Sequence, residues 1–248
     1  MLDRIMARRA SGESRGLDPS YSPEQAIVRQ QLINGDATDL AVVFGPWHGG
    51  SVFPNALARR IAGGGRAVLA LTFHDDILSN NLQTTIDSFE NIKNKIAHHL
   101  FKIRDEYEKI SFIGLSLGNV ALAMVAREFP DFDSAQLVLT ADSLANSMWN
   151  GIRTSHIRDD FEQQGITAED VTIAWKNLAP SEYANDLRGK TVSVVQSAND
   201  EVIPTVYQQQ YIDDLKRAGV EPRVRTTTFG HYLTTMLYCL TPEFLSRT

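Results

Sequence analysis

The sequence predicts one α/β domain built on a mainly parallel, doubly wound sheet with helices on both faces. From residue 39 onward, short apolar runs alternate with segments of helical period, which is the pattern of strand–helix–strand units. The apolar runs are nearly continuous, as in strands that are buried on both faces. The chain has 248 residues and no internal repeat or low-complexity linker, so one large core is expected.

The predicted elements follow this alternation along the chain. A first strand at residues 26–33 has weaker support, because Arg29, Gln30 and Gln31 interrupt its apolar pattern. The stronger strands are predicted at residues 40–44, 67–73, 110–115, 135–140, 191–196 and 223–228. Helices are predicted at residues 55–62, 82–104, 118–129, 205–218 and 232–240, and several of them end at Gly or Pro.

Two segments depart from the alternation. Residues 142–184 contain helix-like pieces at 145–153, 157–164 and 168–177 but no convincing strand. We expect this insertion to form a small helical lid over the carboxyl edge of the sheet, where open α/β sheets place their ligand crevices. Residues 1–23 are rich in Arg, Ser and Gly, which predicts a flexible or loosely packed arm. A short amphipathic helix at residues 1–9 is the alternative.

Composition and charge exclude several classes of protein. The net charge is -6 and the basic residues are scattered, which argues against a nucleic-acid or anionic membrane surface. No secretory signal and no apolar run of about 18 residues occur, so we expect a cytoplasmic protein without a membrane span. Cys239 is the only cysteine, so no intrachain disulfide forms.

The pentapeptide 114–118, Gly-Leu-Ser-Leu-Gly, lies between a predicted strand and a predicted helix. This is the context of a Gly-x-Ser-x-Gly nucleophile elbow. The turn forces Ser116 into a strained backbone conformation, and the two glycines let strand and helix approach closely. Ser116 also lies at a helix N-terminus, whose dipole favours a developing oxyanion. The alternative is a turn serine that caps the helix.

A serine nucleophile needs a histidine to take its proton and a carboxylate to orient that histidine. Asp200 follows the predicted strand 191–196, and His231 follows the predicted strand 223–228. The carboxyl ends of parallel strands lie at one edge of a sheet, so both residues are expected near Ser116. The chain order Ser, Asp, His agrees with this arrangement.

Because they carry these motifs in this order, residues 39–240 resemble the α/β-hydrolase family. The segment 200–204, Asp-Glu-Val-Ile-Pro, looks like the acid loop of the family, and Gly230-His231 looks like its histidine loop. The resemblance implies that Asp200 is the acid and His231 the general base of a catalytic triad. Asp142 follows the strand at 135–140, where some members of the family keep their acid, so it stays an alternative. Glu201 is expected to face solvent.

The oxyanion hole is expected to use two backbone N–H groups. The first belongs to Leu117, which follows the nucleophile, and the second comes from the loop at residues 45–51. Pro46 has no N–H, so Trp47 is preferred and His48 is the rival.

His48, Trp149 and Trp175 are predicted to contact substrate. Met148, Ile152 and Leu178 would extend an apolar wall, although packing against the sheet explains the lid residues equally well. The other histidines, among them His74 beside Asp75 and Asp76, are expected to be solvated or locally hydrogen-bonded, and no metal site is predicted.

Together these features predict a serine hydrolase that cleaves a small ester, thioester or related acyl substrate through an acyl-enzyme, most simply a carboxylesterase. No cofactor is required. The alternatives are a non-catalytic protein that binds a small ligand or partner in the same cleft, and a carbon–carbon bond or peptide hydrolase that uses the same triad. The N-terminal arm has three alternative roles: it wraps the domain, it joins two chains in a homodimer, or it is disordered.

Overall fold

A seven-stranded sheet forms the centre of the computed structural model, which describes residues 20–48 and 52–241. The strand order is β1-β3-β2-β4-β5-β6-β7. β1 runs antiparallel to β3, and every other neighbouring pair is parallel. The predicted mainly parallel sheet is therefore confirmed. The strands are β1 (Ile27–Ile33), β2 (Asp39–Phe44), β3 (Ala67–Phe73), β4 (Lys109–Leu115), β5 (Ser134–Val138), β6 (Thr191–Ser197) and β7 (Arg223–Thr227).

The polar residues that weakened the prediction of the first strand have a simple explanation. β1 is an edge strand, and Arg29, Gln30 and Val28 are exposed to solvent. β5 is shorter than its prediction, which ran to residue 140. Leu139 has a φ of 53°, and a left-handed residue ends the regular strand geometry.

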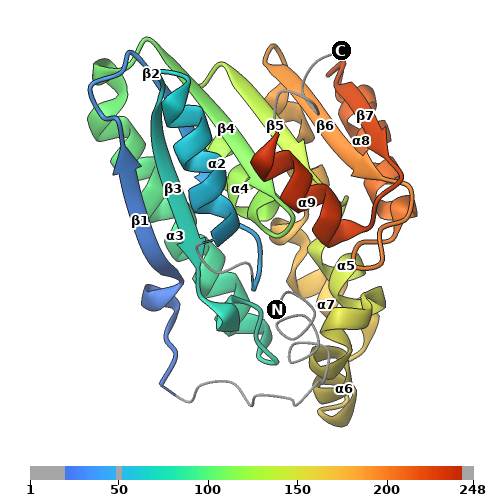
Figure 1. Ribbon diagram of the computed structural model, residues 1–248. Coiled ribbons are helices and arrows are strands. Elements are labelled where there is room, and N and C mark those ends of the chain that lie inside the picture. The colour runs from blue at the N-terminus through green and yellow to red at the C-terminus, as the bar shows by residue number, and fades with distance from the viewer. Residues whose placement is uncertain (1–19, 49–51, 242–248) are drawn as a thin grey trace, which may run out of the picture.

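Helices cover both faces of the sheet (Figure 1). α2 (Val52–Gly63) packs against α9 (His231–Leu240) on one face. α3 (Leu82–Ile103) packs against α4 (Gly118–Glu128) on the other, and α8 (Thr205–Arg217) covers β6. Alternate residues of β2 enter separate cores: Leu40 and Val42 join the side chains of α3 and α4, whereas Ala41 and Val43 join those of α2 and α9. Burial on both faces explains why these strands are continuously apolar.

The predicted helical insertion is a run of short helices between β5 and β6. It comprises α5 (Leu144–Asn150), η4 (Ile152–Thr154), α6 (Ser155–Gln163), α7 (Ala168–Ala174), η5 (Lys176–Leu178) and η6 (Pro180–Leu187), and we call it the helical segment 144–187. α5, α6 and α7 lie at the lower end of the sheet in Figure 1. Asn80, before α3, donates a hydrogen bond of 2.9 Å to Asp160 of α6, which joins this segment to the body of the domain.

Short helices also occur at η1 (Pro23–Gln25), η2 (Asp75–Ile77) and η3 (Arg104–Glu106). Most of the predicted N-terminal arm, with the alternative helix at residues 1–9, lies outside the described residues. Tyr21, near the end of that arm, contacts the body: its hydroxyl is 2.8 Å from Ser88 Oγ, and its ring stacks on His74 at 4.7 Å. In the part of the chain that the structure describes, no helix is long and apolar enough to span a membrane.

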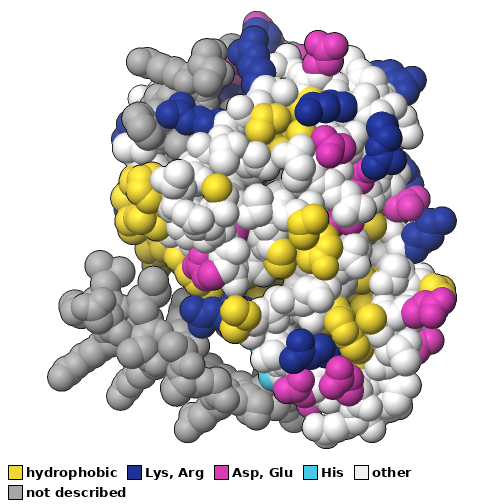
Figure 2. All heavy atoms as spheres, turned by 90° about the vertical axis from the view of Figure 1, so that its right-hand side faces the viewer, with side chains coloured by type: hydrophobic (Ala, Val, Ile, Leu, Met, Phe, Trp, Pro, Cys, Tyr) yellow, Lys and Arg dark blue, Asp and Glu magenta, His cyan; other side chains and the backbone are white. Residues whose placement is uncertain are grey.

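Figure 2 shows the molecule from the side of β7 and α8. On this face, Lys and Arg side chains are interspersed with Asp and Glu side chains. No single sign of charge dominates this side of the molecule.

Candidate active site

Ser116 lies in a strained turn between β4 and α4. Its φ is 52°, a conformation that costs a residue with a side chain about 1–3 kcal/mol. Hydrogen bonds of 2.9 Å hold the turn, one from the N–H of Ser116 to the carbonyl of Val138 and one from the N–H of Asn119 to the carbonyl of Ser116. The Ser116 side chain thereby stands at the carboxyl end of β4.

The glycines on either side of Ser116 are required by close packing. A Cβ at Gly118 would overlap the carbonyl of Phe44 and lie 2.7 Å from the oxygen of Gly45. A Cβ at Gly114 would lie 2.9 Å from Cγ of Asn119. A real Cβ essentially never lies this close to another atom, so glycine at both positions lets α4 start against β2 and β4.

Asn119 supports the turn, and sequence reasoning missed it. Its side chain is buried, and Nδ2 donates to the carbonyls of Ser116 at 2.9 Å and Val138 at 3.0 Å. An asparagine in the first turn of a helix is common, so the sequence carries no signal for this contact.

His231 connects Ser116 to Asp200. Nε2 of His231 is 3.0 Å from Oγ of Ser116, and Nδ1 is 2.9 Å from Oδ2 and 3.0 Å from Oδ1 of Asp200. The exposed fraction is 6% for the His231 side chain and 0% for the Asp200 side chain. The structure thus places His231 within hydrogen-bond reach of both Ser116 and Asp200, the other two residues selected from the sequence.

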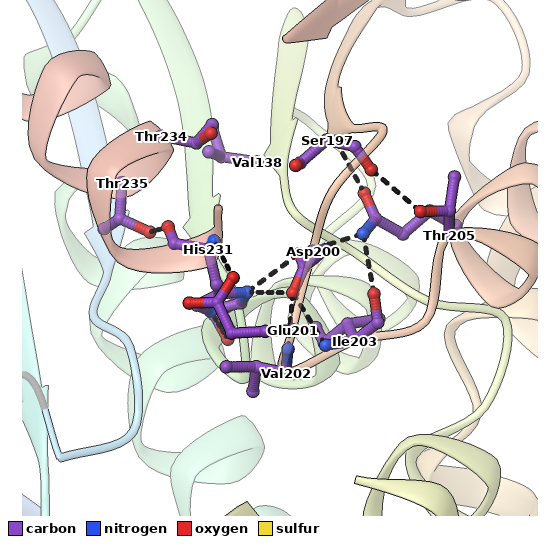
Figure 3. Close-up of polar contacts among 12 residues, drawn as sticks. Val138, Ser197, Asp200, Glu201, Val202, Ile203, Thr205, His231, Thr234 and Thr235 are labelled. Carbon is purple, nitrogen blue, oxygen red and sulfur yellow. Dashed lines mark hydrogen bonds and ion pairs between the residues drawn. The ribbon is translucent and has the colours of Figure 1, made fainter. Parts of the chain in front are cut away.

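The Asp200 carboxylate is fixed by the loop that carries it. Its Oδ1 accepts hydrogen bonds of 2.8 Å from the N–H groups of Val202 and Ile203. In Figure 3, Asp200 lies between His231 on one side and Ile203 on the other. A buried carboxylate needs such partners, and here they also aim it at His231.

A pocket that is open to solvent adjoins Ser116. Among the described residues that line it, none is charged. Leu117 and Trp47 line it on the side of α4 and β2, and the helical segment 144–187 contributes Leu144, Met148 and Pro180. The remaining lining residues are Leu78, Asn119, Val120, Thr140, Ala141, Ser143, Ser147, Thr154, Val202 and Ile203. Ser116 therefore stands beside a mainly apolar cavity.

Comparison with family models and with curated protein sequences gives no match. Solved structures do match. The acylaminoacyl peptidase of Pyrococcus horikoshii has a TM-score of 0.63 at 16% identity, over 86% of this chain and 37% of that one. An esterase of Pyrococcus furiosus has a TM-score of 0.57 at 12% identity, over 86% and 80%. A cold-adapted esterase from an Arctic intertidal metagenomic library has a TM-score of 0.57 at 12% identity, over 84% and 80%.

The chain has the α/β-hydrolase fold. It spans little more than a third of the acylaminoacyl peptidase but most of the length of the two esterases. Identities this low establish the fold alone.

Within the α/β-hydrolase fold, Asp142 does not reach His231. It follows β5 and is buried, and its Oδ2 accepts a hydrogen bond of 3.1 Å from Asn146. Burial raises the pKa of the Asp142 carboxyl, and the Asn146 hydrogen bond opposes this rise. The contacts of His231 therefore favour Asp200 over Asp142 as the carboxylate that orients the imidazole.

Glu201 is exposed to solvent and also contacts the backbone of His231, a contact that the sequence did not suggest. The residue is exposed, as expected, yet its Oε2 accepts a 2.8 Å hydrogen bond from the N–H of His231. His231 is the first residue of α9, so this carboxylate lies at the N-terminus of a helix, where the helix dipole favours negative charge.

Three residues predicted to contact substrate lie outside the pocket lining. Trp175 is fully buried, and its Nε1 donates to the carbonyl of Leu82 at 3.2 Å. This corrects the expectation for Trp175, because a large ring packed in the core cannot reach a ligand. Trp149 packs half-buried against the same core. His48 is exposed, with Nδ1 3.0 Å from Oδ1 of Asp75.

Of the residues predicted to extend an apolar wall, Met148 lines the pocket. Ile152 is exposed and Leu178 is buried in the core, and neither lines the pocket. Trp47 does line the pocket, and its Nε1 donates to the carbonyl of Asp75 at 2.6 Å. The end of the predicted oxyanion loop, residues 49–51, lies outside the described residues.

Two other histidines have local partners. Nδ1 of His74 accepts the N–H of Asp76 at 3.1 Å and caps η2. The ring of His156, in α6, lies 6.5 Å from that of Trp47, and burial lowers the pKa of His156. Over residues 20–48 and 52–241, no group of three or more His, Cys, Asp or Glu side chains could hold a metal ion.

Proposed function

We propose that this protein is a serine hydrolase that cleaves a small uncharged ester, thioester or related acyl substrate, most simply as a carboxylesterase. The observation that carries the proposal is the chain of contacts from Ser116 through His231 to Asp200, at 3.0 and 2.9 Å. These are the distances at which a histidine can activate a serine and a carboxylate can orient the histidine.

The reaction would proceed in two steps, formation of the acyl-enzyme and its hydrolysis. Oγ of Ser116 attacks the acyl carbonyl carbon while Nε2 of His231 takes the hydroxyl proton, and the leaving alcohol or thiol then receives that proton. Water next attacks the acyl-enzyme, with His231 again accepting and returning a proton, and the acid leaves. Asp200 accepts a hydrogen bond from the Nδ1–H group of His231, remains ionised, and stabilises the imidazolium. No cofactor enters either step.

The oxyanion would be bound by backbone N–H groups. Leu117 lies at the N-terminal end of α4, next to Ser116, and its N–H is the first proposed donor. The N–H of Trp47 is the second, since Trp47 lines the same pocket. The helical segment 144–187 would act as the lid, because it supplies one wall of that pocket.

Peptide hydrolysis is the second candidate, since the acylaminoacyl peptidase shares the fold. The described lining of the pocket favours an uncharged acyl substrate over a peptide that is cleaved next to a charged terminus. It contains no charged side chain among the described residues, so it offers no ion-pair partner for the charged terminus of a peptide. A carbon–carbon bond hydrolase would use the same three residues. A binding protein without activity would not need a serine held at a φ of 52° against a histidine.

The experiment is ester hydrolysis by purified protein, with p-nitrophenyl esters of increasing acyl chain length. We expect turnover by the wild-type protein and a fall in kcat of at least about 10³-fold for Ser116→Ala. Ser193→Ala is the matched control, because Ser193 lies on β6 outside the pocket lining, and we expect it to keep wild-type turnover. Turnover that survives in Ser116→Ala would contradict the proposal.

A further inference from the structure

Gln208 of α8 is fully buried behind the proposed acid, eight residues further along the chain. Its Nε2 donates to Oδ2 of Asp200 and to the carbonyl of Ile203, both at 2.9 Å. Its Oε1 accepts the N–H of Ser197 at 3.1 Å. One side chain thus connects the end of β6, the acid loop and the Asp200 carboxylate.

The orientation of this amide is determined by its neighbours. Nε2 faces a carboxylate oxygen of Asp200 and the carbonyl oxygen of Ile203, which can only accept hydrogen bonds. Oε1 faces the N–H of Ser197, which can only donate. A flipped amide would place a carbonyl against two acceptors. α8 is also tied to β6 at its start, because Oγ1 of Thr205 donates to the carbonyl of Ser197 at 3.0 Å. The Gln208 amide is therefore held on a rigid support.

The two oxygens of Asp200 are supported by different groups. Oδ1 is held by two backbone N–H groups of its own loop and also lies 3.0 Å from Nδ1 of His231. Oδ2 has Gln208 as its hydrogen-bond donor besides His231. Without Gln208, the imidazole would be the only hydrogen-bond partner left to Oδ2, and the carboxylate could turn about Oδ1 so that Oδ2 moves out of the plane that faces Nδ1.

We propose that Gln208 is a positioning residue that holds the Asp200 carboxylate in the plane that faces Nδ1 of His231. This inference rests on the serine hydrolase function proposed above. Gln208 does not line the pocket, and of its three hydrogen-bond partners, Ser197, Asp200 and Ile203, Ile203 alone does. It acts through Asp200, so its loss should slow the chemical step and leave substrate binding unchanged.

Two variants test this inference. Gln208→Glu keeps the size of the side chain and an acceptor for the N–H of Ser197. The new carboxylate has no N–H group, so it cannot donate a hydrogen bond to Asp200. Gln208→Met removes every hydrogen bond without adding charge. Gln210→Glu and Gln210→Met are the matched controls, because Gln210 lies on the same helix and is exposed.

We expect both Gln208 variants to fold, as measured by circular dichroism and thermal melting. Their kcat for a p-nitrophenyl ester should fall at least about tenfold while KM stays within about twofold. The downfield proton resonance of the His231 Nδ1–H should shift or broaden in both variants, since it reports the hydrogen bond to Asp200. The Gln210 variants should match the wild-type protein in all three readouts.

Folded Gln208 variants with wild-type kcat and an unchanged resonance would overturn the inference alone. Loss of the folded state in both variants would also overturn it, because the residue would then serve stability. A wild-type protein that hydrolyses no ester would overturn the proposed function, and the Gln208 inference with it.

Discussion

Asp142 and Asp200 show how contacts separate two carboxylates of similar sequence context. Each follows a strand, β5 or β6, and these strands are neighbours in the sheet. Only Asp200 lies within hydrogen-bond distance of His231, whereas Asp142 is held by Asn146. The sequence left both open because each position matches a known place for the acid, and only the fold decides which carboxylate meets the histidine.

The two carboxylates should therefore differ in their effect on activity. Asp200→Asn should lower kcat by at least about 10³-fold, because the amide cannot stabilise the imidazolium. Asp142→Asn should stay within a few-fold of the wild-type kcat. Steady-state hydrolysis of one p-nitrophenyl ester by both variants checks this, and a larger loss in Asp142→Asn would make Asp142 the acid.

Asp142 should instead affect stability, in a manner that depends on pH. Burial raises the pKa of its carboxyl in the folded state, so the native protein holds this proton more tightly than the unfolded chain does. Stability is then lost as pH rises from the ordinary Asp pKa through the raised one. Asp142→Asn should have a higher free energy of unfolding than wild type at pH 7, and the gain should fade toward pH 4. Urea unfolding at both pH values tests this, and an equal difference at both would contradict it.

At the scale of elements, the start of α4 packs closely against the end of β2. Gly118 is the first residue of α4, and its Cα faces the carbonyls of Phe44 and Gly45 at the end of β2. This contact sets the position of the Ser116 turn relative to the loop that carries Trp47.

Gly118→Ala should therefore destabilise the protein by about 3 kcal/mol or more, since a methyl group would force α4 away from β2. Gly63→Ala is the control, because a Cβ at the end of α2 meets nothing within 4 Å. We expect that variant to be neutral or more stable by up to about 1 kcal/mol. Denaturant unfolding of the two variants measures the difference, and equal stabilities would show that the close approach is not needed.

The positions of strands and helices can be predicted where the pattern of apolar residues alone determines them. The strands β2, β3 and β4 are buried on both faces and were predicted almost to the residue. α7 ends at Ala174, where the prediction continued to residue 177. Trp175 faces the core there and donates to Leu82 of α3, a tertiary contact that local periodicity does not contain.

At the scale of the whole molecule, the candidate site is assembled from distant parts of the chain. Ser116 and His231 are 115 residues apart and meet because β4 and β7 end at the same edge of the sheet. Motifs and their order were enough to select Ser116, Asp200 and His231. Asn119 and Gln208 were missed because neither belongs to a motif, and each acts only through packing between elements. The pocket lining was mostly missed for the same reason.

Ser116 is the proposed nucleophile, and His231 is proposed to activate it. The most direct test of this proposal is reaction with a fluorophosphonate probe, followed by mass-spectrometric location of the adduct in wild-type protein and in His231→Ala. We predict one adduct on Ser116 in the wild-type protein and labelling at least about 10³-fold slower in His231→Ala. An adduct on another residue, or labelling of Ser116 that is undiminished in His231→Ala, would contradict the account.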